Sequence, residues 1–151
     1  MYLNSSLLFE ALQKTFSVKK TGPVFREEHL RPPLLYYPGI ALRPDQIYIG
    51  AGPDFDEAAI PPERCCIISV GPLPEKYLRS NASCILVSSP MEIGTLLNQV
   101  QAIFETFRLW ELQLDELIRH NSDIQEILNK SQPFFEGNFF LILDVNYRVL
   151  A

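Results

Sequence analysis

One segment of the chain, from Met91 to about Asn121, contains no proline, and its single glycine, Gly94, falls in the first helical turn. Apolar residues recur there every three or four positions, the spacing that gathers side chains on one face of an α-helix. They fill the a and d positions of successive heptads: Ile93, Leu96, Val100, Ile103, Phe107, Trp110, Leu114 and Leu117. The pattern predicts a long amphipathic helix over residues 91–121, which the run Ser89-Pro90-Met91-Glu92 would cap at its start.

The expected length of this helix raises the question of its packing partner. About 29 residues at 1.5 Å per residue give roughly 43 Å, against roughly 30 Å for the diameter of a small domain. A second copy of the helix is the simplest partner, because twofold homo-oligomers are the commonest assemblies. Phe107 and Trp110 are bulky for a tight parallel pair, so an antiparallel crossing, or one half on the sheet and one half on the partner, fits better. We therefore expect a homodimer with the eight a and d residues at its interface; the alternative is a helix that covers its own sheet.

Short apolar runs before this helix indicate a buried sheet. The runs do not alternate between apolar and polar residues, which is typical of parallel strands covered on both faces. A further run is flanked by prolines, which suits an edge strand. The expected strands are residues 47–50, 65–70 and 84–87, with the edge strand at 34–37. The fold class predicted is α/β: a small, mainly parallel or mixed sheet with short helices at 5–16 and 74–79 and the long C-terminal amphipathic helix. The rest of 17–45 is expected to be irregular because of its glycines and prolines.

These patterns predict three regions. Residues 1–90 are expected to form a small α/β domain, residues 91–121 the long helix, and residues 122–151 a short helix and the first hairpin of a following domain. In the last region, Ser122-Asp123-Ile124-Gln125 predicts the capped start of a second helix. Alternating residues at 139–143, a turn at 144–147 and a strand from Arg148 predict a hairpin. We expect this hairpin to be the first of a following domain, cut short at Ala151.

Composition and charge narrow the classes of function. The net charge is −5 and the isoelectric point is near 5.0, which disfavours direct contact with DNA or RNA. The N-terminus lacks the pattern of a signal peptide, and no apolar run approaches the ~20 residues that span a bilayer, so we expect a cytoplasmic protein without membrane contact. Cys65, Cys66 and Cys84 lie in apolar runs and are expected to be reduced and structural, with any redox role left open.

Residues suited to catalysis or metal binding are sparse. The two histidines, His29 and His120, stand apart, and no metal-ligand spacing or phosphate-binding loop is found, so no cofactor, no metal and no catalytic residue is predicted. The carboxylates of Asp54, Asp56 and Glu57 are expected to be a solvated loop, since acid–base catalysis would require their burial in a cleft. If a small-molecule effector binds, loops after the carboxyl ends of parallel strands are the expected place. The candidates there are Gly50, Gly52, Asp54, Gly71, Ser88 and Ser89.

The second half of the chain resembles the PucR-like family of bacterial transcription regulators. The similar segments are residues 85–87, LLNQVQAIF at 96–104, WELQL at 110–114, IQEIL at 124–128 and NFFLILD at 138–144, with Phe139 where the family usually has proline. The resemblance covers about Ile85 to Ala151. It implies an N-terminal sensory domain and a long helix, followed by a GAF- or PAS-like region and a helix-turn-helix. DNA would then be bound only by a C-terminal part absent from this chain.

Together these patterns predict a non-catalytic sensory and dimerisation module of a bacterial transcription regulator. One alternative is a protein–protein scaffold without a ligand, which a missing or closed apolar pocket would favour. The other is a small enzyme, which a buried Asp54 or Asp56 in a polar cleft would favour.

Overall fold

The computed structural model describes residues 3–23, 25 and 28–134. The chain divides into two compact units, residues 1–105 and 106–151, and each is described here by itself. The hairpin predicted at 139–151 lies outside the described residues. None of the described helices is long and apolar enough to cross a membrane.

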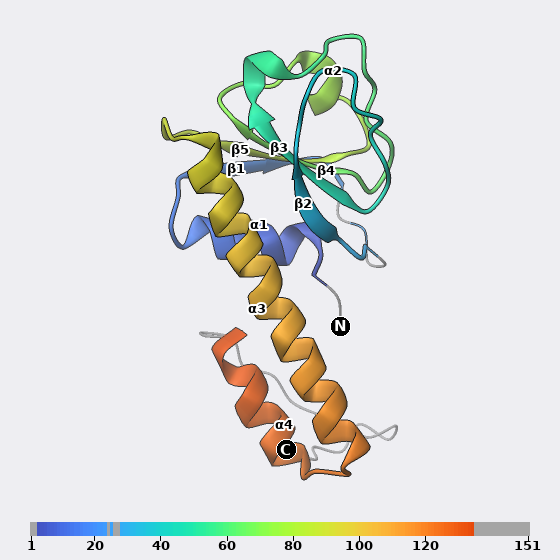
Figure 1. Ribbon diagram of the computed structural model, residues 1–151, viewed down its shortest axis with the longest axis vertical. Coiled ribbons are helices and arrows are strands. Elements are labelled where there is room, and N and C mark those ends of the chain that lie inside the picture. The colour runs from blue at the N-terminus through green and yellow to red at the C-terminus, as the bar shows by residue number, and fades with distance from the viewer. Residues whose placement is uncertain (1–2, 24, 26–27, 135–151) are drawn as a thin grey trace. The chain divides into compact units, whose positions relative to one another are not determined.

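The first unit contains a five-stranded mixed sheet (Figure 1). Its strands are β1 (Val18–Thr21), β2 (Arg31–Leu35), β3 (Gln46–Ala51), β4 (Cys66–Val70) and β5 (Ser83–Val87), in the order β1-β5-β4-β3-β2. Strands β2 to β5 are parallel, and β1 pairs antiparallel with β5 at one edge. The predicted mainly parallel α/β sheet is confirmed. The expectation that the first part of 17–45 is irregular was wrong, because β1 lies there.

The residue types of β4 and β2 explain why one strand is central and the other lies at an edge. Ile67 and Ile68 on β4 point to opposite faces and are both fully buried, as the non-alternating pattern of a central strand requires. Strand β2 is at the other edge, as predicted, although it begins at Arg31 and not at Leu34. Pro32 and Pro33 lack backbone N–H donors, which an edge strand tolerates and a central one does not.

Two layers cover the sheet (Figure 1). Successive parallel strands step in one direction across the sheet, and right-handed crossovers then place all their connections on the same face. That face carries α2 (Glu75–Leu78) and the 3-10 helix η1 (Gly52–Asp54). Its core comprises Tyr36, Tyr48, Phe55, Cys65, Ile67, Leu73, Tyr77, Ala82 and Cys84.

The opposite face is covered by α1 (Ser5–Gln13) and by the first turns of the long helix. Asn4 caps α1, because its Oδ1 accepts hydrogen bonds from the backbone N–H groups of Ser6 and Leu7 at 3.0 Å. Leu8 and Leu12, one helical turn apart, are fully buried.

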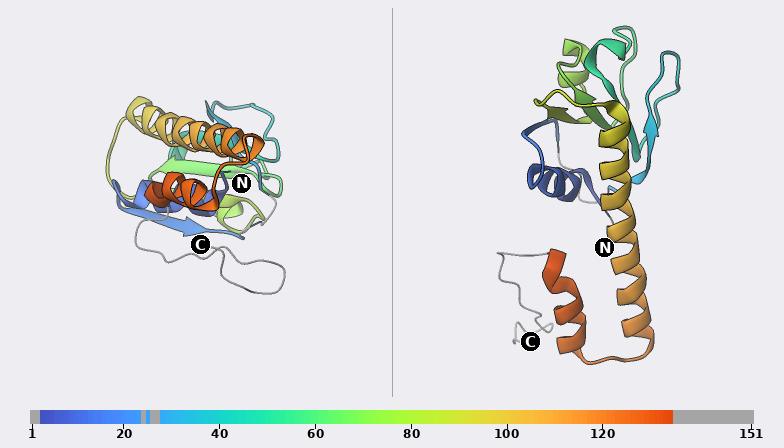
Figure 2. Two further views of the ribbon diagram at one scale, coloured as in Figure 1. Left: turned by 90° about the horizontal axis from the view of Figure 1, so that it is seen from below. Right: turned by 60° about the vertical axis from the view of Figure 1, so that its left-hand side comes forward.

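The long helix α3 spans Ile93–Arg119 and confirms the prediction of a single long helix. It begins after Pro90, so the predicted capping box with proline in the first helical position does not form; the first backbone bond joins the Leu96 N–H to the Glu92 carbonyl. In the second unit, α4 (Ile124–Ser131) lies antiparallel to the end of α3 (Figure 2) and is followed by η2 (Gln132–Phe134). Asp123, not Ser122, caps α4.

Candidate functional site

The loops that follow β3 and β4 are in close contact. A Cβ atom placed on Gly52 would lie 2.0 Å from the carbonyl oxygen of Pro72, so only glycine fits at this position. Gly71 has a φ of +84°, a left-handed conformation that glycine adopts without strain. The Ser69 hydroxyl donates a hydrogen bond to the Gly71 carbonyl at 2.9 Å and stabilises this turn. The carboxyl ends of the two strands are therefore held together by backbone packing.

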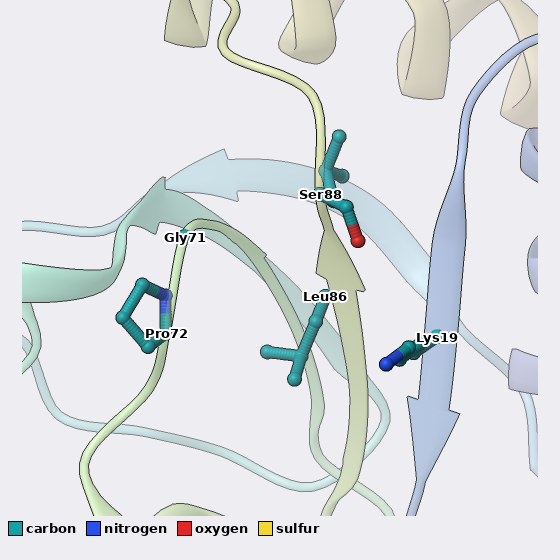
Figure 3. A pocket seen from close by; sticks show the side chains of 6 residues that line it. Lys19, Gly71, Pro72, Leu86 and Ser88 are labelled. Carbon is teal, nitrogen blue, oxygen red and sulfur yellow. The ribbon is translucent and has the colours of Figure 1, made fainter.

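Beside this turn lies an open pocket of about 290 Å³ (Figure 3). It is lined by Lys19, Gly71, Pro72, Leu86, Val87 and Ser88. We treat it as the candidate functional site, because ligands of α/β sheets bind at the carboxyl ends of parallel strands.

Strand pairing positions the side chains of this pocket. The antiparallel register sets Lys19 on β1 opposite Leu86 on β5, so the two side chains share one face. Figure 3 shows the Lys19 side chain directed from β1 toward Leu86, with Ser88 at the end of β5. The site thus joins an edge strand, the turn after β4 and the exit from β5.

Backbone donors around the pocket already have partners. The Gly71 N–H donates to the Val87 carbonyl at 3.2 Å, and the Ser88 N–H donates to the Ser17 carbonyl at 2.9 Å. Pro72 has no N–H to donate. The side-chain donors of the pocket are the Lys19 ammonium and the Ser88 hydroxyl.

Electrostatically, the pocket is cationic. No carboxylate is among its lining residues. Among the residues that the structure describes, Lys19 has no ion-pair partner, and the pairs Arg64–Asp45 and Arg79–Glu75 lie elsewhere. The positive charge of Lys19 is therefore available to a ligand, although the protein as a whole is acidic.

The structure brings together two of the six predicted ligand-binding residues, Gly71 and Ser88. Gly50 instead packs in the core beneath Phe55 and Tyr36, and Gly52 packs against Pro72. Asp54 and Ser89 are exposed and line neither described pocket. Lys19 was missed, because its strand was not predicted.

The acidic loop does not form a buried acid–base pair. Asp54, Asp56 and Glu57 are exposed, and the Asp56 carboxylate accepts the N–H of Ala58 at 2.7 Å within its own turn. Glu57 borders a second open hollow of about 230 Å³, with Pro74, Glu75 and Lys76. The buried aspartate that an enzyme-like site would require here is not found, and the described residues hold no cluster of three metal-binding side chains.

The three thiols are buried in the sheet core. Burial raises the pKa of the Cys65 thiol to about 12 and that of Cys84 to about 11, and it raises the pKa of Cys66 well above its ordinary value. Because the thiolate is the reactive form, these pKa values leave almost no nucleophile at neutral pH.

We expect all three cysteines of the native protein to resist Ellman's reagent at pH 8. The reagent should find three reactive thiols only after unfolding in guanidinium. The measurement is the absorbance of released thionitrobenzoate over time, with free cysteine as the control. A native thiol that reacts as fast as free cysteine would contradict this expectation and point to a redox role.

The a and d residues of α3 divide between the two units. Leu96 and Val100 are buried in the first unit. Trp110 is buried in the second, where its indole N–H donates to the Ser131 hydroxyl of α4 at 3.3 Å. Ile93, Ile103, Phe107, Leu114 and Leu117 are half-buried. Three of the eight proposed interface residues are therefore already buried within one chain, and the homodimer stays a prediction.

Comparison with known proteins adds no relative. No family model, no curated protein and no solved structure matches the chain. The resemblance to PucR-like regulators therefore stays a prediction from the quoted segments.

Proposed function

We propose that this chain is a non-catalytic sensory module of a bacterial transcription regulator, in which a small molecule binds the Lys19–Ser88 pocket and biases the start of α3. The observation that carries the proposal is the position of the pocket in the chain. The lining residues Leu86 and Val87 end β5, and the lining residue Ser88 begins the connection that leads into α3. Only residues 88–92 separate β5 from the helix.

A ligand in this pocket would act on a short and tethered connection. Ser88 is fixed to the edge strand through its N–H bond to the Ser17 carbonyl. On the far side of the connection, Leu96 and Val100 hold the first turns of α3 in the core of the same unit. A ligand that binds one arrangement of this connection more tightly than another shifts the population toward it, which is the physical basis of sensing.

The chemistry of the pocket favours binding over catalysis. A serine nucleophile needs a base within hydrogen-bonding distance, and among the described residues no hydrogen bond joins Ser88 to Lys19. The acidic side chains of the neighbouring loop are exposed and turned to solvent. The arrangement therefore offers recognition groups without an activated nucleophile.

One observation supports the alternative of a protein–protein scaffold. Leu34, Leu35 and Tyr37 are large apolar side chains exposed at and after the edge strand β2. Apolar side chains gathered at an edge are typical of contact surfaces. Against simple strand addition, Pro32 and Pro33 remove two backbone donors from the same edge.

The proposal is tested by a ligand screen that measures the melting temperature of the protein and amide hydrogen exchange at the start of α3. We expect members of a panel of small acids, amines, sugars and nucleosides to raise the melting temperature, because a ligand that binds only the native state stabilises it. The same compounds should slow amide hydrogen exchange over residues 88–100.

The matched variants are Ser88→Trp, which fills the pocket, and Lys76→Trp, which fills the second hollow. Ser88→Trp should abolish both effects, and Lys76→Trp should leave them intact. A panel without any hit, or hits that survive Ser88→Trp, would overturn the sensory proposal and favour the scaffold.

A further inference from the structure

We propose that the pocket recognises a small organic carboxylate with an apolar body, whose acid group is held by the Lys19 ammonium and the Ser88 hydroxyl. This inference rests on the proposed function and narrows it to a class of ligand. It follows from the size of the pocket, from the polar groups it still offers and from the apolar surface beside them.

The size of the pocket limits the ligand. Its volume of about 290 Å³ lies at the lower end of ordinary ligand pockets, which span roughly 300–1,000 Å³. A short-chain acid fits within this space.

The polar groups of the pocket favour a ligand with a negative charge. The Lys19 ammonium repels a cation, and no lining carboxylate offsets that repulsion. A neutral alcohol would accept a hydrogen bond but would forgo the stronger, charge-assisted one. An anion gains from both the ammonium and the hydroxyl.

A carboxylate fits the remaining donors better than a phosphate does. Phosphate sites are usually built from several convergent backbone N–H groups. Here the N–H groups of Gly71 and Ser88 already donate to carbonyls, and Pro72 has none. One ammonium and one hydroxyl match the two oxygens of a carboxylate.

The apolar surface of the pocket accounts for the body of the ligand. Leu86 is half-buried and lies between Lys19 and the Pro72 ring (Figure 3). A hydrocarbon chain extending from the acid group would cover Leu86 and Pro72, and each methylene buried there adds to the affinity. Longer acids should therefore bind more tightly until the pocket is full.

The test is a titration of the isotope-labelled full chain with hexanoate, followed by two-dimensional ¹H–¹⁵N NMR. We expect hexanoate to shift the amide signals of Lys19, Gly71 and residues 86–88 in a saturable way. Butanoate should bind more weakly, and hexylammonium, hexan-1-ol and inorganic phosphate should not shift this set. Lys19→Met should weaken hexanoate binding about tenfold, whereas Lys19→Arg should restore most of it.

The control variant is Lys14→Met, which removes an exposed lysine at the end of α1, away from the pocket. It should leave hexanoate binding unchanged. Equal losses in Lys14→Met and Lys19→Met would reveal general attraction of anions and overturn the inference.

Further outcomes separate this inference from the function on which it rests. Binding of hexylammonium or hexan-1-ol at the same residues, as tight as that of hexanoate, would overturn the carboxylate class and leave a ligand pocket in place. Phosphate binding as tight as hexanoate would do the same. If no probe shifts these amides and the broader panel gives no hit, both the class and the sensory function fail.

Discussion

Gly52→Ala is expected to lower the free energy of unfolding by about 2–3 kcal/mol, the cost of forcing an extra group into a packed interior. The new methyl group would lie 2.0 Å from the Pro72 carbonyl oxygen and 2.8 Å from its carbonyl carbon. Both are backbone atoms, so no rotamer change relieves the overlap, and the two loops must move apart. Because the Pro72 turn forms one wall of the pocket, ligand binding should weaken along with stability.

The measurement is urea unfolding of the wild type and the variant, followed by circular dichroism and extrapolated linearly to water. Gly94→Ala is the matched control, because a Cβ atom at Gly94 meets nothing within 4 Å. Gly94 lies inside α3, where alanine is favoured over glycine by up to about 1 kcal/mol. We therefore expect the control to be neutral or stabilising. A Gly52→Ala protein within about 0.5 kcal/mol of wild type would contradict the close approach of the two loops.

Glu28→Ala is expected to destabilise the first unit by about 2–3 kcal/mol, because it leaves a buried backbone N–H donor without its acceptor. Glu28 is 1% exposed, and its Oε2 accepts the backbone N–H of Ser5 at 2.6 Å. Ser5 is the first residue of α1, where a negative charge is favoured by the helix dipole. The same carboxylate also interacts with Lys20. Burial lowers the pKa of Lys20, and the negative charge of Glu28 opposes that shift. Removing Glu28 leaves the Ser5 N–H without its acceptor and removes the carboxylate charge that most strongly favours the charged form of Lys20.

Amide hydrogen exchange of β4 and β5 measures this loss directly in the first unit. Glu28→Gln keeps an acceptor for Ser5 but removes the charge, so its stability should lie between those of wild type and Glu28→Ala. The control is Glu10→Ala, an exposed change on the same helix that should stay within about 0.5 kcal/mol. Equal stability of Glu28→Ala and Glu10→Ala would show that the Ser5 bond contributes nothing.

The features predicted correctly from the sequence depend on neighbours along the chain. The periodicity of Leu96, Val100 and Trp110 is local, and it indicated α3 without knowledge of the partner of the helix. The non-alternating run at 66–70 indicated a strand buried on both faces, because its immediate neighbours in sequence already show the pattern. Prolines near Leu34 indicated an edge, because a missing N–H is a property of the residue itself.

The features that were missed depend on residues far apart in sequence. Val18 to Thr21 is too short and too polar to indicate a strand, and only its pairing with Cys84 to Val87 makes it one. Lys19 enters the pocket for this reason alone, so the cation of the site could not be predicted. Likewise, Trp110 is buried and bonded to Ser131 on α4, a partner that the pattern of α3 does not indicate.

Periodicity, prolines and glycines in this chain thus specify the elements and their class, because helical turns and strand edges are set by local backbone chemistry. The tertiary structure decided which strand lies beside β5, which face of α3 is covered, and which lysine lines the pocket with Ser88. Those choices depend on burying apolar surface and pairing backbone groups between segments distant in sequence, and a local pattern carries no record of its distant partner.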